Sequence, residues 1–124
     1  MKKRILVVDD SETALVMARD ALEGAGFEVV TAPGAREADA WLYADQQPDL
    51  VILDVMMPLT SGDQKARMLK QDNRTRHIPV LLLSSKPETD LRRLANESGA
   101  DGFIRKPFGQ RQIVDQVAAA LRRV

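Results

Sequence analysis

Three uninterrupted runs of four apolar residues constrain the fold of this chain more than any other feature of its sequence. They are Ile5–Val8, Leu50–Leu53 and Val80–Leu83. A strand with one face in water alternates apolar and polar residues, whereas a strand covered on both faces is apolar throughout. The runs therefore predict a parallel β-sheet with helices on both faces. Phe27–Ala32 and Gly102–Arg105 are weaker strand patterns, and the first of them is expected nearer an edge of the sheet.

Helical patterns occupy the segments between these strands. Apolar residues from Ala14 to Ala25 recur at spacings of three and four, which predicts a helix with one buried stripe and Ser11 as its N-cap. Alternation of strands and helices at this spacing gives βαβ units with right-handed crossovers. The predicted fold class is α/β, a doubly wound three-layer arrangement of five parallel strands and five helices. The other four helices are expected at about 35–46, 62–71, from Pro87 onward, and at about 110–122.

Length and composition narrow the class of protein further. The 124 residues fit one domain of common size, so we expect a single domain over residues 1–124. The chain has no cysteine, which excludes disulfides and cysteine-based metal or nucleophile chemistry. The basic start Met1–Arg4 precedes an apolar run too short for a signal-peptide core or a membrane span. We therefore expect a cytoplasmic protein with no segment inserted in a membrane.

The charge pattern gives little reason to expect nucleic-acid binding. The chain has 18 basic and 18 acidic residues, with the acids concentrated in the first half and the bases in the second. Such asymmetry can indicate a charged partner, but here the basic residues are scattered and the aromatic residues are few. We expect a normally solvated surface, an acidic site in the first half, and no direct contact with nucleic acid.

Polar residues with related chemistry stand at the ends of the predicted strands. Asp9 and Asp10 follow the first strand, Asp54 the third, Ser84 the fourth, and Lys106 the fifth. Ligands of doubly wound sheets bind beyond the carboxyl ends of the strands, so these side chains are expected to converge there. Each one alone is as consistent with a turn or a helix cap. The prediction of a functional site depends on four strand ends carrying residues that one reaction needs.

That reaction is the transfer of a phosphoryl group to a carboxylate. Three clustered carboxylates repel one another, and a hard divalent cation relieves the repulsion. Mg²⁺ binds through one or two carboxylates together with phosphate oxygens, and Mn²⁺ could substitute for it. Asp54 is then the nucleophile, the cation and Lys106 stabilise the phosphoryl oxygens, and the Ser84 hydroxyl meets the product phosphate.

The motifs around these residues resemble the receiver domains of two-component response regulators, of which the single-domain chemotaxis regulators are the simplest. The resemblance extends from Ile5 to about Leu121. It implies a flavodoxin-like sheet in the order 2-1-3-4-5, phosphorylation by a sensor histidine kinase or phosphotransfer protein, and catalysis only of the domain's own phosphorylation and dephosphorylation. The segments that carry it are Ile5–Asp10, Asp54–Pro58, Gly62, Pro79–Ser85 and Gly99–Phe108.

The resemblance also implies a metal ligand set. Asp54 corresponds to the phosphoacceptor and also contacts the metal. Asp10 corresponds to a direct Mg²⁺ ligand and Asp9 to one that acts mainly through water. The backbone carbonyl of Met56 corresponds to the third protein ligand.

Further positions correspond to the family's switch. Ser84 matches the hydroxyl that turns toward the phosphate, and Lys106 matches the lysine that pairs with it. The Lys106–Pro107 bond is expected to be cis. Phe103 occupies the position of the aromatic residue whose rotamer reports phosphorylation. The surface formed by the fourth helix, fifth strand and fifth helix is then expected to contact an output partner or a second copy of the chain.

Two other functions fit the sequence less well. A haloacid-dehalogenase-type phosphatase needs a second carboxylate two residues after its nucleophile, where this chain has Met56. No glycine-rich nucleotide-binding motif follows a strand, so no organic cofactor is expected. A receiver that is never phosphorylated and serves only for docking is the nearer alternative. The resemblance also implies that the positions of Met56 and Lys86 tune dephosphorylation. Neither residue is a carboxylate or an amide suited to guide an attacking water, which predicts a phosphoryl lifetime of minutes or longer.

Overall fold

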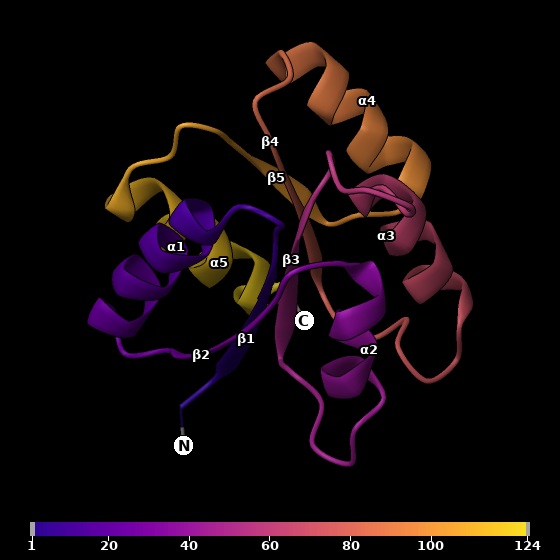
Figure 1. Ribbon diagram of the computed structural model, residues 1–124, viewed down its shortest axis with the longest axis horizontal. Helices are drawn as coiled ribbons and strands as arrows, with labels where there is room; N and C mark the ends of the chain where they lie inside the picture. The colour runs from indigo at the N-terminus through magenta and orange to yellow at the C-terminus, as the bar shows by residue number, and fades with distance from the viewer. Residues whose placement is uncertain (1, 124) are drawn as a thin grey trace.

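The computed structural model describes residues 2–123, and it contains the predicted five-stranded parallel sheet (Figure 1). The strand order is β2-β1-β3-β4-β5, and every neighbouring pair runs parallel. This confirms the predicted fold class and the flavodoxin-like order. The strands are β1 (Arg4–Val8), β2 (Glu28–Ala32), β3 (Leu50–Asp54), β4 (Val80–Ser84) and β5 (Gly102–Arg105).

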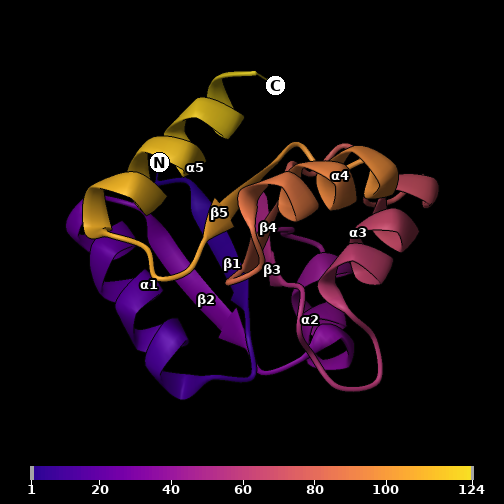
Figure 2. The ribbon, with the colours of Figure 1, turned by 90° about the horizontal axis from the view of Figure 1, so that it is seen from above.

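Five helices cover the two faces of the sheet. Helices α1 and α5 pack on one face, and α2, α3 and α4 pack on the other (Figures 1 and 2). None of the helices among the described residues is long and apolar enough to cross a membrane. The helices are α1 (Glu12–Gly24), α2 (Ala35–Leu42), α3 (Gly62–Gln71), α4 (Glu88–Ser98) and α5 (Gln110–Arg122).

The continuous apolar strands supply both halves of the core. In β1, Ile5 and Val7 face the helices α1 and α5, whereas Leu6 and Val8 face the opposite layer. All four are fully buried, as are the corresponding runs of β3 and β4. Burial of each such side chain contributes about 1.5–3 kcal/mol, so the central strands hold their carboxyl ends in a rigid frame.

Helix α2 is shorter than the sequence pattern suggests. We predicted a helix to about residue 46, but it ends at Leu42, and Tyr43 is its C-cap. The Gln47 side chain donates a hydrogen bond to the Leu42 carbonyl at 2.7 Å. This hydrogen bond satisfies the Leu42 carbonyl, which a further helical turn would otherwise have paired.

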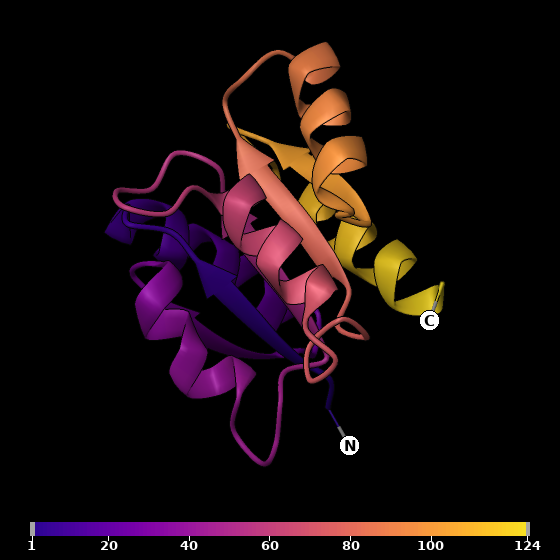
Figure 3. The same ribbon diagram turned by 90° about the vertical axis from the view of Figure 1, so that its right-hand side faces the viewer.

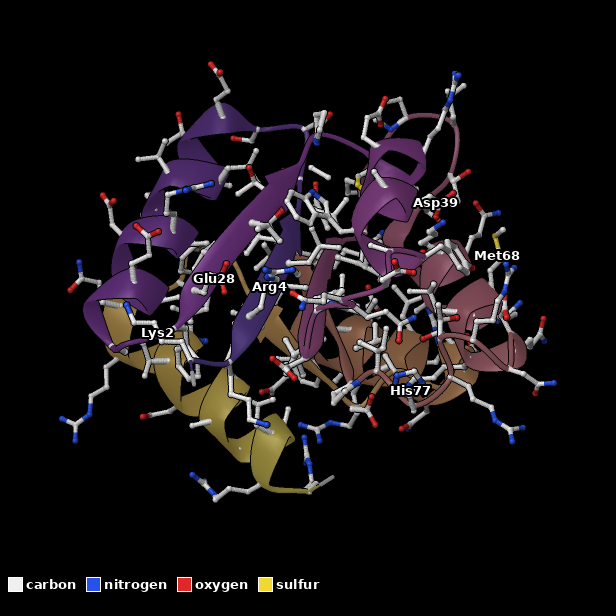
Figure 4. The ribbon with its side chains drawn as sticks, turned by 90° about the horizontal axis from the view of Figure 1, so that it is seen from below. Lys2, Arg4, Glu28, Asp39, Met68 and His77 are labelled. Atoms are coloured by element: carbon white, nitrogen blue, oxygen red, sulfur yellow. The ribbon has the colours of Figure 1, made fainter. Side chains whose placement is uncertain are left out.

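Polar contacts fix the helices next to the strand ends. Ser11 is the N-cap of α1, as predicted, and its hydroxyl accepts a bond from the Ala14 amide at 3.3 Å. Ser61 begins α3 with a reciprocal capping box to Gln64. On the other layer, Asp39 of α2 is turned toward α3, where the buried Lys65 pairs with it (Figure 4). The loops that follow β1 and β3 therefore lead into helices whose N-termini are capped by side chains.

Candidate functional site

The sheet register brings the predicted residues together at one edge of the sheet, where the carboxyl ends of the strands lie. Strand β3 lies between β1 and β4, with Leu53 opposite Val8 and Asp54 opposite Leu83. Asp9 immediately follows β1, and Ser84 is the last residue of β4. The strands point to a common edge, from which the loop between β3 and α3 projects (Figure 3).

Three carboxylates form the centre of this edge. One oxygen from each of Asp9, Asp10 and Asp54 lies within 4.8 Å of the other two. Asp9 is fully buried and Asp54 is 3 % exposed, whereas Asp10 is exposed. Asp9 Oδ1 accepts a bond from the Ser11 amide at 2.9 Å, so the start of α1 orients that carboxylate. The cluster has two fixed, desolvated members and one that reaches solvent.

Lys106 adds the positive charge that the sequence led us to expect. Its Nζ lies 2.8 Å from Asp9 Oδ2 and 3.6 Å from Asp54 Oδ1. The Lys106 amide donates to the Ser84 carbonyl at 2.8 Å, which ties the end of β5 to the end of β4. The Lys106–Pro107 bond is cis, as the family resemblance implies.

Burial and neighbouring charge shift the acid–base behaviour of the cluster. Loss of water around Asp54, together with the charge of Asp9, raises the pKa of Asp54 to about 6 despite the opposing effect of Lys106. Burial alone would lower the pKa of Lys106, but the adjacent Asp9 and Asp54 carboxylates outweigh burial and raise it. Lys106 therefore stays charged at neutral pH. A further cation would reduce the remaining repulsion between the Asp54 and Asp9 carboxylates.

The donor set fits a hard divalent cation. Asp9 Oδ2 is buried, and its close partner within residues 2–123 is the Lys106 ammonium at 2.8 Å. All three candidate ligands offer carboxylate oxygens, which Mg²⁺, Mn²⁺ and Ca²⁺ prefer over nitrogen or sulfur. The acidic triad is thus consistent with the metal site of receiver domains.

Two of the predicted residues lie outside this cluster of charges. Ser84 is buried, and its hydroxyl accepts a bond from the Lys86 amide at 3.1 Å rather than contacting a carboxylate. Phe103 lies in β5 opposite Leu82, partly buried against the core. The guanidinium of Arg92 lies 5.6 Å from the centre of its ring. The position of Ser84 is therefore set by the Lys86 amide, and that of Phe103 by the core and Arg92, rather than by the carboxylates.

Gly62 has a role that the motif alone did not reveal. A Cβ added there would lie 2.2 Å from the carbonyl oxygen of Asp54, which is far inside any allowed contact. The Gly62 amide also donates to the Val55 carbonyl at 3.1 Å. The start of α3 therefore packs directly on the backbone of Asp54, and only glycine permits that approach.

Comparison with known proteins decides the family. The model of the response regulator receiver domain matches residues 5–118. The chain belongs to this family. It is 44 % identical over 121 residues to the phosphate regulon transcriptional regulatory protein PhoB of Pseudomonas aeruginosa, covering 98 % of this chain and 52 % of that protein. It is 38 % identical to the alkaline phosphatase synthesis regulatory protein PhoP of Bacillus subtilis, covering 99 % and 50 %.

Solved receiver structures agree with this assignment. The chemotaxis response regulator CheY4 of Vibrio cholerae is 28 % identical, with a TM-score of 0.88 and coverage of 97 % and 99 % of the two chains. The BeF3-activated receiver domain of DrrB is also 28 % identical, with a TM-score of 0.82 and coverage of 98 % and 99 %. The chain spans about half the length of the curated relatives it matches.

Membership in the family has direct consequences. It implies signalling through a phosphoaspartate and a cognate histidine kinase. Receiver domains are not ordinary enzymes that turn over a separate substrate. The receiver domain carries its acidic pocket on Asp9, Asp10 and Asp54.

Proposed function

We propose that Asp54 accepts a phosphoryl group from the phosphohistidine of a sensor kinase or phosphotransfer protein, in a reaction that depends on Mg²⁺. The observation that carries this proposal is the position of the Asp54 carboxylate, buried between the other acids and the Lys106 ammonium. A carboxylate held only for stability would be expected to have its charge satisfied, whereas the pKa of Asp54 is raised to about 6.

The chemistry follows from the side chains present. An oxygen of ionised Asp54 attacks phosphorus as the P–N bond of the donor breaks, and the imidazole leaves with the bonding electron pair. Lys106 Nζ lies 3.6 Å from Asp54 Oδ1, within reach of an oxygen of the incoming phosphoryl group. The product is an acyl phosphate on Asp54.

Asp9, Asp10 and Asp54, together with the backbone carbonyl of Met56, are the residues that would hold the cation. A bound Mg²⁺ supplies neutralisation of the phosphoryl oxygens, and Mn²⁺ could substitute for it. Asp9 brings a buried carboxylate oriented by the Ser11 amide and Lys106, and Asp10 brings one open to solvent. The ligand set is therefore partly fixed before the ion arrives, which favours a single geometry.

We further propose that phosphorylation changes the surface of α4, β5 and α5. The Ser84 hydroxyl must leave the Lys86 amide in order to bond the phosphate, and Phe103 then moves into the space. Phosphorylation shifts this equilibrium only by the difference in its interaction energy with the two states. The altered surface would bind an output partner or a second copy of the chain.

The relatives bear on the extent of the domain and on its relation to transcription. Of the proteins named above, PhoB and PhoP are about twice as long as this chain, and both are named as transcriptional regulatory proteins. We propose that residues 1–124 act as one receiver domain in the cytoplasm, without contacting DNA themselves. Any effect on transcription would belong to the output partner or to another domain.

Small phosphodonors test the central proposal directly. Acetyl phosphate or phosphoramidate with Mg²⁺ should add one phosphoryl group to the intact mass of the protein, and chelation with EDTA should prevent it. Asp54→Asn should abolish the addition. An unphosphorylated wild-type protein under these conditions would instead favour a docking module, and phosphorylation retained in the Asp54→Asn variant would place the acceptor elsewhere.

A further inference from the structure

Leu59 adopts a backbone conformation that leucine disfavours. Its φ of 70° makes it the sole residue other than glycine with positive φ within residues 2–123. The Thr60 amide donates to the Pro58 carbonyl at 2.8 Å, which closes a tight γ-turn around Leu59. Glycine would adopt this conformation more easily, because it has no Cβ. The local backbone therefore does not explain the choice of leucine.

Packing within the domain does not explain it either. The Leu59 side chain is 100 % exposed, so it gives the folded chain no hydrophobic stabilisation. It stands at the rim of a hollow of about 380 Å³ between residues 33–37, before and at the start of α2, and residues 58–60. Pro33, Ala35 and Pro58 contribute apolar surface to this hollow, and Arg36 and Glu37 contribute charge. We call this feature, together with Leu59, the Leu59 hollow.

The Leu59 hollow lies close to the phosphoacceptor. Leu59 is five residues beyond Asp54, which limits the distance between their Cα atoms to about 17 Å. The bond from the Gly62 amide to the Val55 carbonyl folds the loop back on the end of β3. The loop projects from the edge of the sheet (Figure 3). An interface of ordinary size covers about 800 Å² per partner, a disc of about 16 Å radius. Because the folded loop is shorter than the extended limit, a protein centred on Asp54 would reach it.

We propose that the Leu59 hollow is a docking contact for the protein that carries the phosphohistidine, and that it accepts an apolar side chain of that donor. The inference rests on the proposed function of Asp54. A phosphodonor must bring its imidazole to Asp54 and so must lie over the adjoining loop, whereas a second copy or an output partner is under no such constraint. Desolvation of the exposed leucine in the complex compensates for the strain of the turn.

Comparing two phosphodonors separates docking from chemistry. The protein donor is the autophosphorylated histidine kinase of the source organism that transfers fastest to the wild-type chain. The small donor is phosphoramidate, which offers the same P–N bond without a protein surface. Leu59→Asn should lower kcat/KM for the kinase at least tenfold and leave the rate with phosphoramidate within twofold.

A matched control uses another exposed apolar residue. Met68 is 55 % exposed and points outward from α3, away from the sheet (Figure 4). Met68→Asn should leave the rates with both donors within twofold. Leu59→Asn should unfold at about the same urea concentration as wild type, because the Leu59 side chain is fully exposed and packs on nothing in the folded chain. A loss of transfer in a protein of undiminished stability identifies a contact with the donor.

Several outcomes would overturn the inference. Kinase transfer that is unchanged by Leu59→Asn removes the docking role, and equal losses with both donors assign Leu59 to the chemistry of the site. Loss of self-association alone would make a second copy the occupant. If phosphoramidate phosphorylates the wild type but no kinase does, donor docking is wrong and the role of Asp54 stands. If neither donor phosphorylates Asp54, the proposed function is lost as well.

Discussion

Two aspartates of this chain differ in how well their surroundings accept a negative charge. Asp72, at the C-cap of α3, receives bonds from the Arg74 guanidinium and the Tyr43 hydroxyl, and these partners lower the pKa of Asp72 to about 2. Asp54 is buried beside Asp9, and its pKa is raised to about 6. The ionised form of Asp72 is therefore stabilised in the folded protein, whereas the ionised form of Asp54 is destabilised, as is common for a functional residue.

The same contrast extends to the loops that hold these residues. Around Asp72, Arg74 also stacks over Tyr43 at 4.5 Å, so both charged groups of the Asp72–Arg74 pair have a partner. Around Asp54, the β3–α3 loop contains a leucine with positive φ, a second buried carboxylate (Asp9) lies nearby, and Gly62 packs directly on the Asp54 backbone. Conflicts of this kind concentrate where a protein binds or reacts.

The largest effect on stability is expected at Gly62. Gly62→Ala places a methyl group 2.2 Å from the Asp54 carbonyl oxygen, so the loop or the strand end must move. We expect a loss of about 2–3 kcal/mol in the free energy of unfolding, measured by urea denaturation, together with slower phosphorylation by acetyl phosphate.

Gly24→Ala is the matched control, because nothing lies within 4 Å of a Cβ added there at the end of α1. Its stability should be equal to that of the wild type or slightly higher. Equal stability of the Gly62 and Gly24 variants would show that the approach of α3 to Asp54 is not tight.

The next effect concerns Asp54 itself in metal-free protein. The folded chain holds a proton on Asp54 up to about pH 6, whereas the unfolded chain releases it near pH 3.8. This contribution to stability is therefore full below pH 4 and is lost as the pH rises through 6. Asp54→Asn removes the loss and should stabilise the protein at pH 8 by about 1–2.5 kcal/mol, as measured by urea denaturation in EDTA.

Two conditions sharpen that prediction. The advantage of Asp54→Asn should disappear at pH 3.5–4, and at pH 8 it should shrink when Mg²⁺ is added, because the ion binds the wild-type carboxylates. A variant that is less stable than wild type in EDTA at pH 8 would mean that Asp54 supports the fold, as Asp72 does.

The smallest effect is expected at Asp72, with the opposite sign. Its lowered pKa provides stability above about pH 4 that is lost as the pH falls toward 2. Asp72 is partly exposed at the surface, where solvent screens its charge, so Asp72→Asn should lower the thermal midpoint at pH 7 only slightly, and less so at pH 2.5. If Asp72→Asn stabilised the protein at pH 7, the contrast between the two aspartates would be lost.

Much of the fold and of the candidate site could be predicted from the residues. The apolar run Leu50–Leu53 predicted a strand buried on both faces, and the pattern from Ala14 to Ala25 predicted a helix with one buried side. Ala14, Ala18, Ala21 and Leu22 form that buried side, but Met17 is 46 % exposed and Ala25 lies beyond the end of α1. These periodicities are local, so they can be recognised without tertiary structure. The order of the strands is not local, and it was available only through the family resemblance.

The end of α2 and the role of Gly62 show where local patterns are insufficient. Residues 43–46 fit a helical pattern, but Gln47, held between Leu42 and the Arg74 carbonyl, ends the helix earlier. Gly62 was part of a motif, but its necessity depends on a contact with the Asp54 carbonyl that the sequence does not display.

The sequence by itself determined the parallel α/β architecture and which residues stand at the strand ends, because the spacing of apolar residues is a local property of the chain. Only the tertiary structure decided how those ends act together. The pKa of Asp54 depends on Asp9 and Lys106, which the parallel sheet brings within a few ångströms from distant parts of the chain. Electrostatic energy depends on separation in space and on burial, and both are properties of the folded protein.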